Sequence, residues 1–129
     1  MPLTANANTT VVGGPVNAAE TVCAITTPLI MPRDSEIVLV MFMVVLTVGA
    51  SSTQVTFRIR QGTLVTGAAI QQNVNDQGIV AGNVMTRTIL GVDTPLLGAN
   101  LQWNLTITQA GGTGNGTVTQ IVAAAFSFL

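Results

Sequence analysis

The sequence is poor in the residue types on which most catalytic and ligand-binding sites depend. Its 129 residues include no histidine, no lysine and no tyrosine, one cysteine and one tryptophan, and only 7% of them are charged. Without histidine, neither a Ser-His-Asp triad nor a His-ligated zinc or haem site can form. A lone cysteine cannot close a disulfide within the chain. We therefore expect no enzymatic activity and no cofactor.

The charge is equally sparse and argues against two classes of partner. Four arginines and five acidic residues give a net charge of −1, which provides no basic patch for the phosphates of a nucleic acid. The apolar run Ile37–Val48 has about half of the roughly 20 residues that a bilayer-spanning helix needs. The start of the chain, Met1–Asn8, lacks the charged and apolar regions of a secretory signal. We expect neither a nucleic-acid nor a membrane partner.

Glycine, proline and asparagine divide the chain into eight short runs rich in residues that favour strands, and no stretch has helical periodicity. The runs are Thr9–Val12, Thr21–Thr27, Glu36–Val48, Thr53–Gln61, Ala68–Val74, Asn83–Val92, Asn100–Thr108 and Thr117–Leu129. This spacing is typical of an antiparallel sandwich. The sequence predicts an all-β protein, a single eight-stranded antiparallel jelly roll. Residues 1–19 form an N-terminal arm with the first short strand, and residues 20–129 form the jelly-roll domain.

The runs differ in how their polar residues are placed. Thr53–Gln61 and Asn100–Thr108 alternate between apolar and polar residues, as strands with water on one side do. The third and eighth runs, Glu36–Val48 and Thr117–Leu129, are apolar on both faces. In an eight-stranded jelly roll, the third and eighth strands are neighbours in one sheet, and the fourth and seventh lie in the other. The outer face of the first sheet is then apolar.

A large exposed apolar face is rare on soluble monomers, and covering it favours association. The sequence therefore predicts an obligate homo-oligomer, a trimer around this sheet. The alternative is that the lead segment or a loop covers the same face within one chain. The expected interface residues are Leu39, Met41, Met43, Val45, Phe126 and Phe128.

Charged residues offer few other candidates for a site. Arg58 and Arg60 lie on one face of their run, either solvated and discouraging edge pairing or in contact with a neighbouring shell protein. Asp93 precedes Thr94-Pro95 and is a turn former by its chemistry. We interpret the other acidic turns, Arg33–Glu36 and Asn75–Gly78, as solvated. Single residues with structural roles are Trp103 and Cys23, expected in the core, and Arg87, which would need a carboxylate or carbonyl partner if its strand joins the oligomer sheet.

Several segments together resemble a known group of proteins. The stretch Ser52–Thr63, with its alternating Thr53-Gln54-Val55-Thr56-Phe57-Arg58-Ile59-Arg60, resembles one hairpin of the group. With Gly91–Pro95 and the glycine-rich hairpin Leu105–Gln120, it is similar to small jelly-roll modules of tailed-phage virions, which are tumour-necrosis-factor-like in shape. The likeness spans about residues 20–129 and is one of pattern. No stalk sequence is present, unlike in a typical fibre.

The resemblance implies a structural role on a virus particle and brings no catalytic residues. The leading hypothesis is a non-enzymatic homotrimer on the capsid surface that decorates or cements the shell, with the major capsid protein or another virion protein as partner. The first twenty residues are then an arm that orders against a neighbour. A second hypothesis is a receptor- or glycan-binding knob that acts through loops 49–52, 62–67, 75–82 and 110–116. A small self-assembling coat protein is the third.

Overall fold

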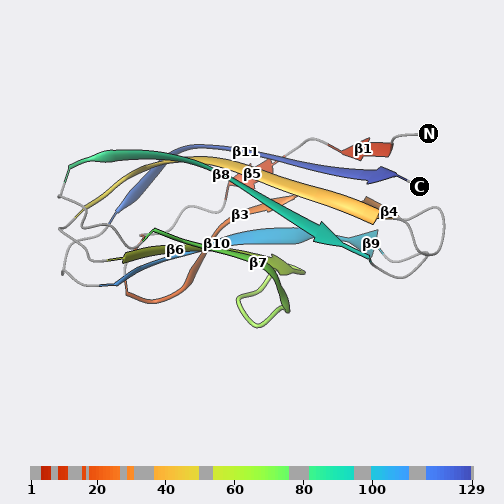
Figure 1. The fold of residues 1–129 in the computed structure, drawn as a ribbon, viewed down its shortest axis with the longest axis horizontal. Helices are drawn as coiled ribbons and strands as arrows, with labels where there is room; N and C mark the ends of the chain where they lie inside the picture. The colour runs from red at the N-terminus through yellow and green to blue at the C-terminus, as the bar shows by residue number, and fades with distance from the viewer. Residues whose placement is uncertain are drawn as a thin grey trace.

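Two layers of antiparallel strands pack face to face in the computed structural model, and Figure 1 shows them along the length of the molecule. The structure describes residues 4–6, 9–11, 16, 18–26, 29–30, 37–49, 54–75, 82–94, 100–110 and 116–128. These residues contain strands and no helix. The predicted all-β antiparallel sandwich is confirmed at this level.

The upper layer in Figure 1 is a four-stranded sheet and the lower layer a five-stranded sheet. The four-stranded sheet has the order β1 (Thr4–Asn6), β11 (Thr117–Phe128), β5 (Ile37–Thr47) and β8 (Val84–Asp93). The five-stranded sheet has the order β2 (Thr9–Val11), β3 (Thr21–Thr26), β10 (Trp103–Ala110), β6 (Gln54–Gln61) and β7 (Ala69–Asn75). A small two-stranded sheet joins β4 (Leu29–Ile30) to β9 (Asn100–Leu101).

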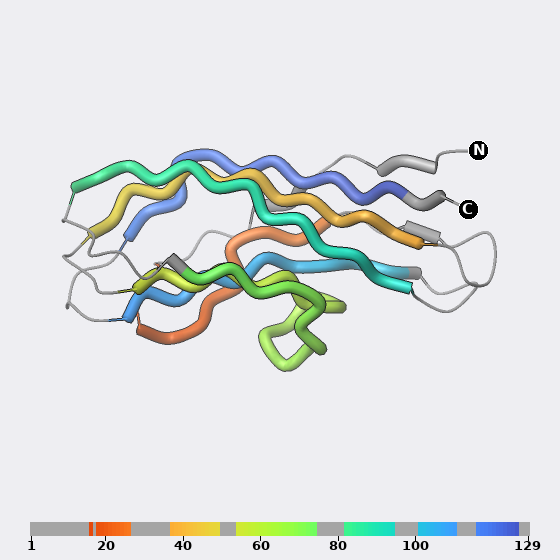
Figure 2. Tube along the Cα trace, in the orientation of Figure 1, coloured from red at the N-terminus to blue at the C-terminus, as the bar shows by residue number. Residues whose placement is uncertain are grey.

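The strand neighbours expected from the jelly-roll order are present. The third and eighth runs pair as β5 and β11, from Phe128 opposite Ile37 to Thr117 opposite Thr47. The fourth and seventh runs pair in the other sheet as β6 and β10. Figure 2 shows that these two central pairs lie one above the other. The four strands that the sequence singled out therefore form the middle of the sandwich.

The expected number of eight strands is not what the structure has, because eleven strands occur within the described ranges. Two of the additional short strands, β1 and β4, lie outside the eight runs. The third arises because the run Asn100–Thr108 is interrupted at Gln102. The Gln102 carbonyl accepts a hydrogen bond from the Gly62 N–H (2.8 Å), and its amide group donates to the Thr26 carbonyl (3.0 Å). These bonds hold the backbone where it passes from the small sheet into β10.

The core lies between the layers and uses alternate residues of the central strands. Fully buried side chains point inward from both sheets; they include Val38, Val40, Phe42, Val44 and Leu46 of β5, Val55, Phe57 and Ile59 of β6, and Trp103, Leu105 and Ile107 of β10. The predicted alternation in β6 and β10 is therefore confirmed, as is the core position of Trp103. Cys23 is also buried, and burial raises the pKa of its thiol to about 11, which keeps it protonated and unreactive at neutral pH.

Candidate functional site

The outer face of the four-stranded sheet exposes several large apolar side chains. The inward residues of β5 fill the core, so its alternate residues, from Ile37 to Val45, point away from it. Met43 is 39% exposed, and its neighbours on the same face include Leu90 of β8 (50%), Val92 of β8 (58%) and Val122 of β11 (42%). Side chains with this exposure are in contact with water over much of their apolar surface.

Cross-strand pairing arranges these side chains in rows across β11, β5 and β8. Directly opposite residues in neighbouring strands lie close enough for their side chains to interact. The first three rows are Phe126–Leu39–Val92, Ala124–Met41–Leu90 and Val122–Met43–Thr88. Eight of these nine residues are apolar, so the rows form one continuous patch.

Most of the interface residues expected from the sequence lie on this face. Leu39, Met41, Met43 and Val45 are its β5 residues, and Phe126 lies opposite Leu39. Phe128 stands opposite Ile37 in the register, while its side chain lies outside the described part of the structure. Sequence reasoning missed the apolar residues of the neighbouring strands, chiefly Leu90, Val92 and Val122. For Leu90 and Val92 the signal is the period-two alternation of β8, which its threonines obscure, and Val122 lies in the run Thr117–Leu129 that is apolar on both faces.

The described residues of the lead segment do not cover this patch. Thr4–Asn6 form β1, which pairs with residues 125–127 at the edge of β11. Thr9–Val11 form β2, which belongs to the opposite sheet. The patch keeps the exposure given above in the presence of both strands.

Arg87 lies on β8, the outermost strand of the sheet on the other side. It pairs with Val44, so it shares its parity with the buried residues of β8 and leaves the strand on the inner side of the sheet, while its guanidinium stays in contact with solvent. Its guanidinium donates to the Thr86 carbonyl (2.9 Å), the type of partner that the sequence reasoning required. An inward-pointing charge on an edge strand opposes pairing with the edge of another sheet.

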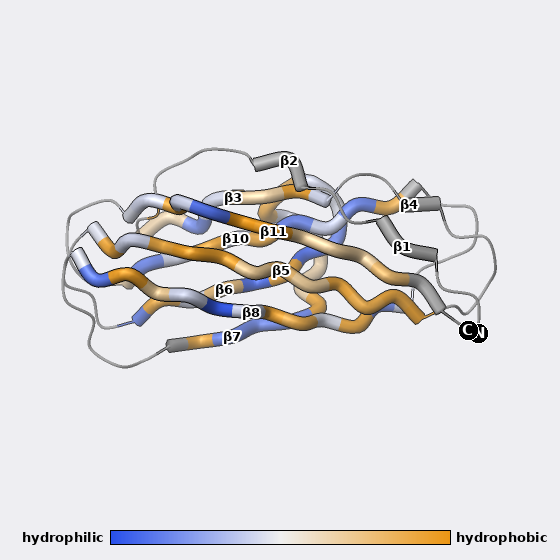
Figure 3. The backbone as a smooth tube through the Cα atoms, turned by 90° about the horizontal axis from the view of Figure 1, so that it is seen from above, coloured by the Kyte–Doolittle hydropathy of each residue, from blue (hydrophilic) through white to orange (hydrophobic). Residues whose placement is uncertain are grey.

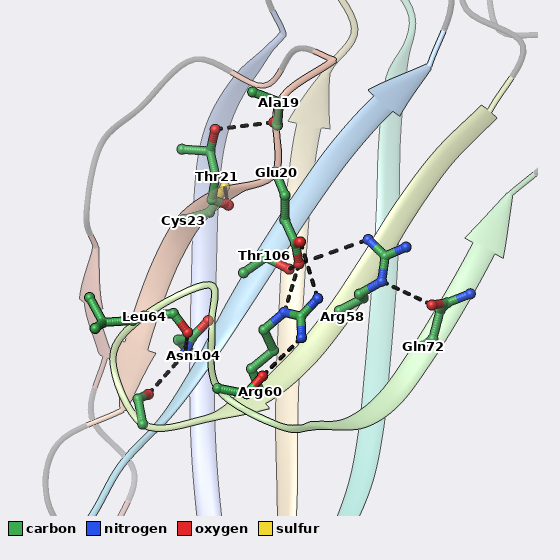
Figure 4. Close-up of polar contacts among 12 residues, drawn as sticks. Ala19, Glu20, Thr21, Cys23, Arg58, Arg60, Leu64, Gln72, Asn104 and Thr106 are labelled. Atoms are coloured by element: carbon green, nitrogen blue, oxygen red, sulfur yellow. Dashed lines mark hydrogen bonds and ion pairs between the residues drawn. The ribbon is translucent and has the colours of Figure 1, made fainter.

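The outer face of the five-stranded sheet carries a polar cluster centred on Glu20 (Figure 4). Arg60 binds both carboxylate oxygens of Glu20, with Nε–Oε1 at 2.7 Å and Nη2–Oε2 at 3.1 Å. The Thr106 hydroxyl donates to Oε1 (2.6 Å), and the Arg58 guanidinium lies 3.8 Å from the same atom. Partial burial alone would raise the pKa of Glu20. The hydrogen bonds from Arg60 and Thr106 and the charges of both arginines outweigh it, so the pKa lies below the ordinary value of 4.5.

The same face is partly covered by the β6–β7 loop, residues 62–68. The buried Asn104 amide donates to the carbonyls of Gly62 (2.9 Å) and Leu64 (3.2 Å), and Arg60 donates to the Gly67 carbonyl (2.9 Å). A Cβ on Gly67 would lie 1.8 Å from the carbonyl oxygen of Gln61, so only glycine fits there. Leu64, 65% exposed, stands at the tip of this fixed loop beside Val65.

This arrangement corrects one expectation and refines another. Asn104 and Thr106 point outward from β10 as predicted, yet they are fully buried rather than solvated, because the loop and Glu20 cover them. Arg58 and Arg60 share a face as predicted, and both interact with Glu20. The sequence could not reveal this partner, since Glu20 is about forty residues away along the chain. A contact between these arginines and another protein stays a prediction.

Asp93 links the two layers near the end of β8. It is a buried carboxylate whose Oδ2 accepts from the Trp103 indole N–H (2.8 Å), and the Gln61 amide donates to both of its oxygens (2.9 and 3.0 Å). The Thr94 backbone N–H donates to Oδ1 (2.9 Å), which agrees with the turn-forming role expected from the sequence. Because four hydrogen bonds from three donor groups surround the carboxylate, we interpret its role as structural.

The described residues form neither a cluster of metal-ligating side chains nor a membrane-spanning helix. They contain no group of three or more potential metal-ligating side chains. They also contain no helix long and apolar enough to cross a lipid bilayer. The acidic candidates Asp34, Glu36 and Asp76 lie outside the described ranges, as does Arg33.

No protein-family model matches this sequence, and no curated protein matches it significantly. Solved structures do resemble the chain. The Eiger tumour necrosis factor of S. frugiperda has a TM-score of 0.51 at 10% identity, over 100% of this chain and 94% of that one. A chain of infectious bursal disease virus, Gx strain, has a TM-score of 0.53 at 12% identity, over 98% of this chain and 33% of that one.

A protein of Bacillus endospore appendages, described as disulfide-linked pili, matches at a TM-score of 0.43 and 14% identity, over 99% and 90% of the two chains. A score this low supports no conclusion. At such identities the two better matches establish a shared fold and nothing more. They support the tumour-necrosis-factor-like jelly roll expected from the sequence, whereas the tailed-phage part of that expectation rests on the sequence pattern alone.

The Glu20 cluster predicts a specific dependence of stability on pH. Because folding lowers the pKa of Glu20, its contribution is complete above the ordinary value of 4.5 and is lost as the pH falls through the lower folded value. Glu20→Gln should reduce the free energy of unfolding by about 1 kcal/mol at pH 7. Urea denaturation between pH 7 and pH 3 should give a smaller loss of stability for the variant. Parallel curves for the two proteins would contradict the role of Glu20.

The contacts of Asp93 predict a larger effect. Asp93→Asn retains the shape of the side chain but places an amide NH₂ against N–H donors, and should cost about 1–3 kcal/mol of unfolding free energy. The comparison is Thr94→Ala, which keeps the backbone N–H and alters an exposed side chain, and should cost less than about 0.5 kcal/mol. Both are measured by urea denaturation followed by circular dichroism. Equal small losses would show that the link between the layers is dispensable.

Proposed function

We propose that this protein is a non-enzymatic structural subunit that assembles as a homotrimer through the outer face of its four-stranded sheet and decorates or cements a virus capsid. The observation that carries the proposal is the exposed patch formed by the rows of β11, β5 and β8. The proposed interface residues are Leu39, Met41, Met43, Val45, Phe126 and Phe128, with Leu90, Val92 and Val122 added from the structure.

The energetics of the patch favour association. Removing apolar surface from water contributes about 25 cal/mol per Å² of favourable free energy. A monomer with this patch exposed does not gain that free energy, whereas an assembly that buries the patch does. Arg87 opposes growth of the sheet by edge pairing, so the face is the more favourable contact. A closed assembly around this face removes the patch from water and leaves the polar outer face of the other sheet outside.

The comparisons add limited support to a role on a particle. The fold is shared with a chain of infectious bursal disease virus and with a tumour necrosis factor. A jelly roll used as a building block of a virus fits a location on the virion surface. We assign the major capsid protein, or another virion protein, as the second partner, with the N-terminal residues and the Arg58–Arg60 face as candidate contacts.

The proposal is tested first by the mass of the protein in solution. Sedimentation velocity at micromolar concentration should give a species of three times 13.3 kDa, about 40 kDa. The expected cause is burial of the apolar patch, so dilution should favour dissociation and raising the ionic strength should not. A species that remains at 13.3 kDa over the whole concentration range would refute the proposed assembly.

A second candidate function is a receptor- or glycan-binding knob, and the loop at residues 62–68 favours it. Hydrogen bonds from Asn104 and Arg60 hold this loop in place, while Leu64 and Val65 are exposed at its tip. A loop that is already ordered loses little conformational entropy when it binds a partner. This is the property expected of a recognition loop.

One experiment separates the two roles. The purified protein is incubated with empty shells of its own virus and, separately, with host cells and a glycan array. A cement protein binds the shells and raises their melting temperature, and Leu64→Ser/Val65→Ser leaves both unchanged. A knob binds cells or glycans, and the same double variant abolishes that binding without changing the sedimentation coefficient. Absence of shell binding would remove the capsid role.

A further inference from the structure

The apolar character of the outer face changes along the sheet. Each row across β11, β5 and β8 has three residues. Starting from Phe126–Leu39–Val92, the five successive rows contain three, three, two, one and one apolar residues. The last two rows are Gln120–Val45–Thr86 and Thr117–Thr47–Val84. We call the first three rows, which contain Phe126, Ala124 and Val122, the terminal half, and the last two the distal half.

The two halves correspond to the two ends of the sandwich. The terminal half lies where β5 begins at Ile37 and β11 ends at Phe128. Figure 3 shows hydrophobic colour along β5 and over the last part of β8, whereas the first parts of β8 and β11 include hydrophilic segments. Three connections between strands join strand ends at the distal end of the sandwich. They are residues 48–53 between β5 and β6, 76–83 between β7 and β8, and 111–116 between β10 and β11.

The chemistry of the face indicates what covers it. None of the residues in the five rows is charged. Two copies of such a surface can meet without repulsion between like charges, and the surface offers no charge to attract an oppositely charged partner. Of the described lead residues, Thr4–Asn6 lie at the edge of β11 and Thr9–Val11 belong to the opposite sheet, so the chain does not cover the face with those residues. A second copy of the same chain is the occupant that these observations favour.

We infer that copies of this protein contact one another through the terminal half alone, so that their distal halves diverge from the shared axis. This inference rests on the proposed assembly and specifies its geometry. The subunits meet where β5 begins and β11 ends, so Val45, which the proposed assembly counted in the interface, lies outside the contact. The threonines and Gln120 of the distal half remain in water, and the distal ends of β5, β8 and β11 lie away from the contact.

Two valines on β8 provide a matched test. Val92 and Val84 lie on the same strand and face, are 58% and 63% exposed, and belong to the terminal and distal halves respectively. Val92→Asp should raise the concentration at which half of the chains are assembled by at least tenfold, whereas Val84→Asp should change it less than twofold. Sedimentation velocity over a dilution series measures both, and circular dichroism reports whether each variant is folded.

The outcomes distinguish this inference from the proposed function. If Val84→Asp weakens assembly as much as Val92→Asp, the contact spans the whole face and the inference is wrong, while the assembly stands. If the unmodified protein is monomeric throughout, the proposed function fails before the variants matter. If Val92→Asp does not fold, the isosteric pair Val92→Thr and Val84→Thr decides between the halves by the same measurement, with a shift of several-fold expected for Val92→Thr only.

Discussion

The pairing of β5 with β11 is the contact on which the rest of the structure depends. The inward residues of β5, from Val38 to Leu46, are fully buried and supply much of the core. Because side chains alternate along a strand, nothing in this packing requires the outward residues to be apolar. Leu39, Met41 and Met43 are apolar nonetheless, and Phe126 and Val122 extend the patch onto β11. The proposed association between copies accounts for the apolar composition of the outer face.

The outer face of the five-stranded sheet is polar, and part of it is covered by other segments of the same chain. There the outward residues Asn104 and Thr106 are buried by the chain itself, through the loop at residues 62–68 and Glu20. Hydrogen bonds satisfy the NH₂ group of Asn104 and the carboxylate of Glu20, while Oδ1 of Asn104 is buried without a hydrogen-bond partner. The five-stranded sheet is thus closed by local polar contacts, while the terminal half of the four-stranded sheet is not closed by any described segment.

Features that depend on the periodicity of the sequence were predicted correctly, whereas contacts between residues far apart in the sequence were not predicted. The alternation in Thr53–Gln61 and Asn100–Thr108 identified the core faces of β6 and β10, and the expected jelly-roll order made β5 and β11 partners. The expected count of eight strands was wrong because short pairings such as β4 with β9 depend on tertiary contacts. The ion pair of Glu20 with Arg60 and the indole contact of Asp93 were not foreseen. Each joins residues from different strands, and no local pattern encodes such a meeting.

The edges of the four-stranded sheet decide between two ways of associating. An unpaired edge can extend a sheet from one copy to the next, and such head-to-tail growth gives an open filament when the rotation between copies does not close a ring. On one side β1 pairs with residues 125–127 of β11, and on the other side Arg87 points inward from β8. Pairing at the edge of β8 would remove the Arg87 charge further from water, which costs desolvation free energy. Contact through the uncharged apolar face has no such cost. The chain therefore combines partly protected edges with an uncharged face, a combination that favours a closed assembly with a fixed number of copies over an open fibre.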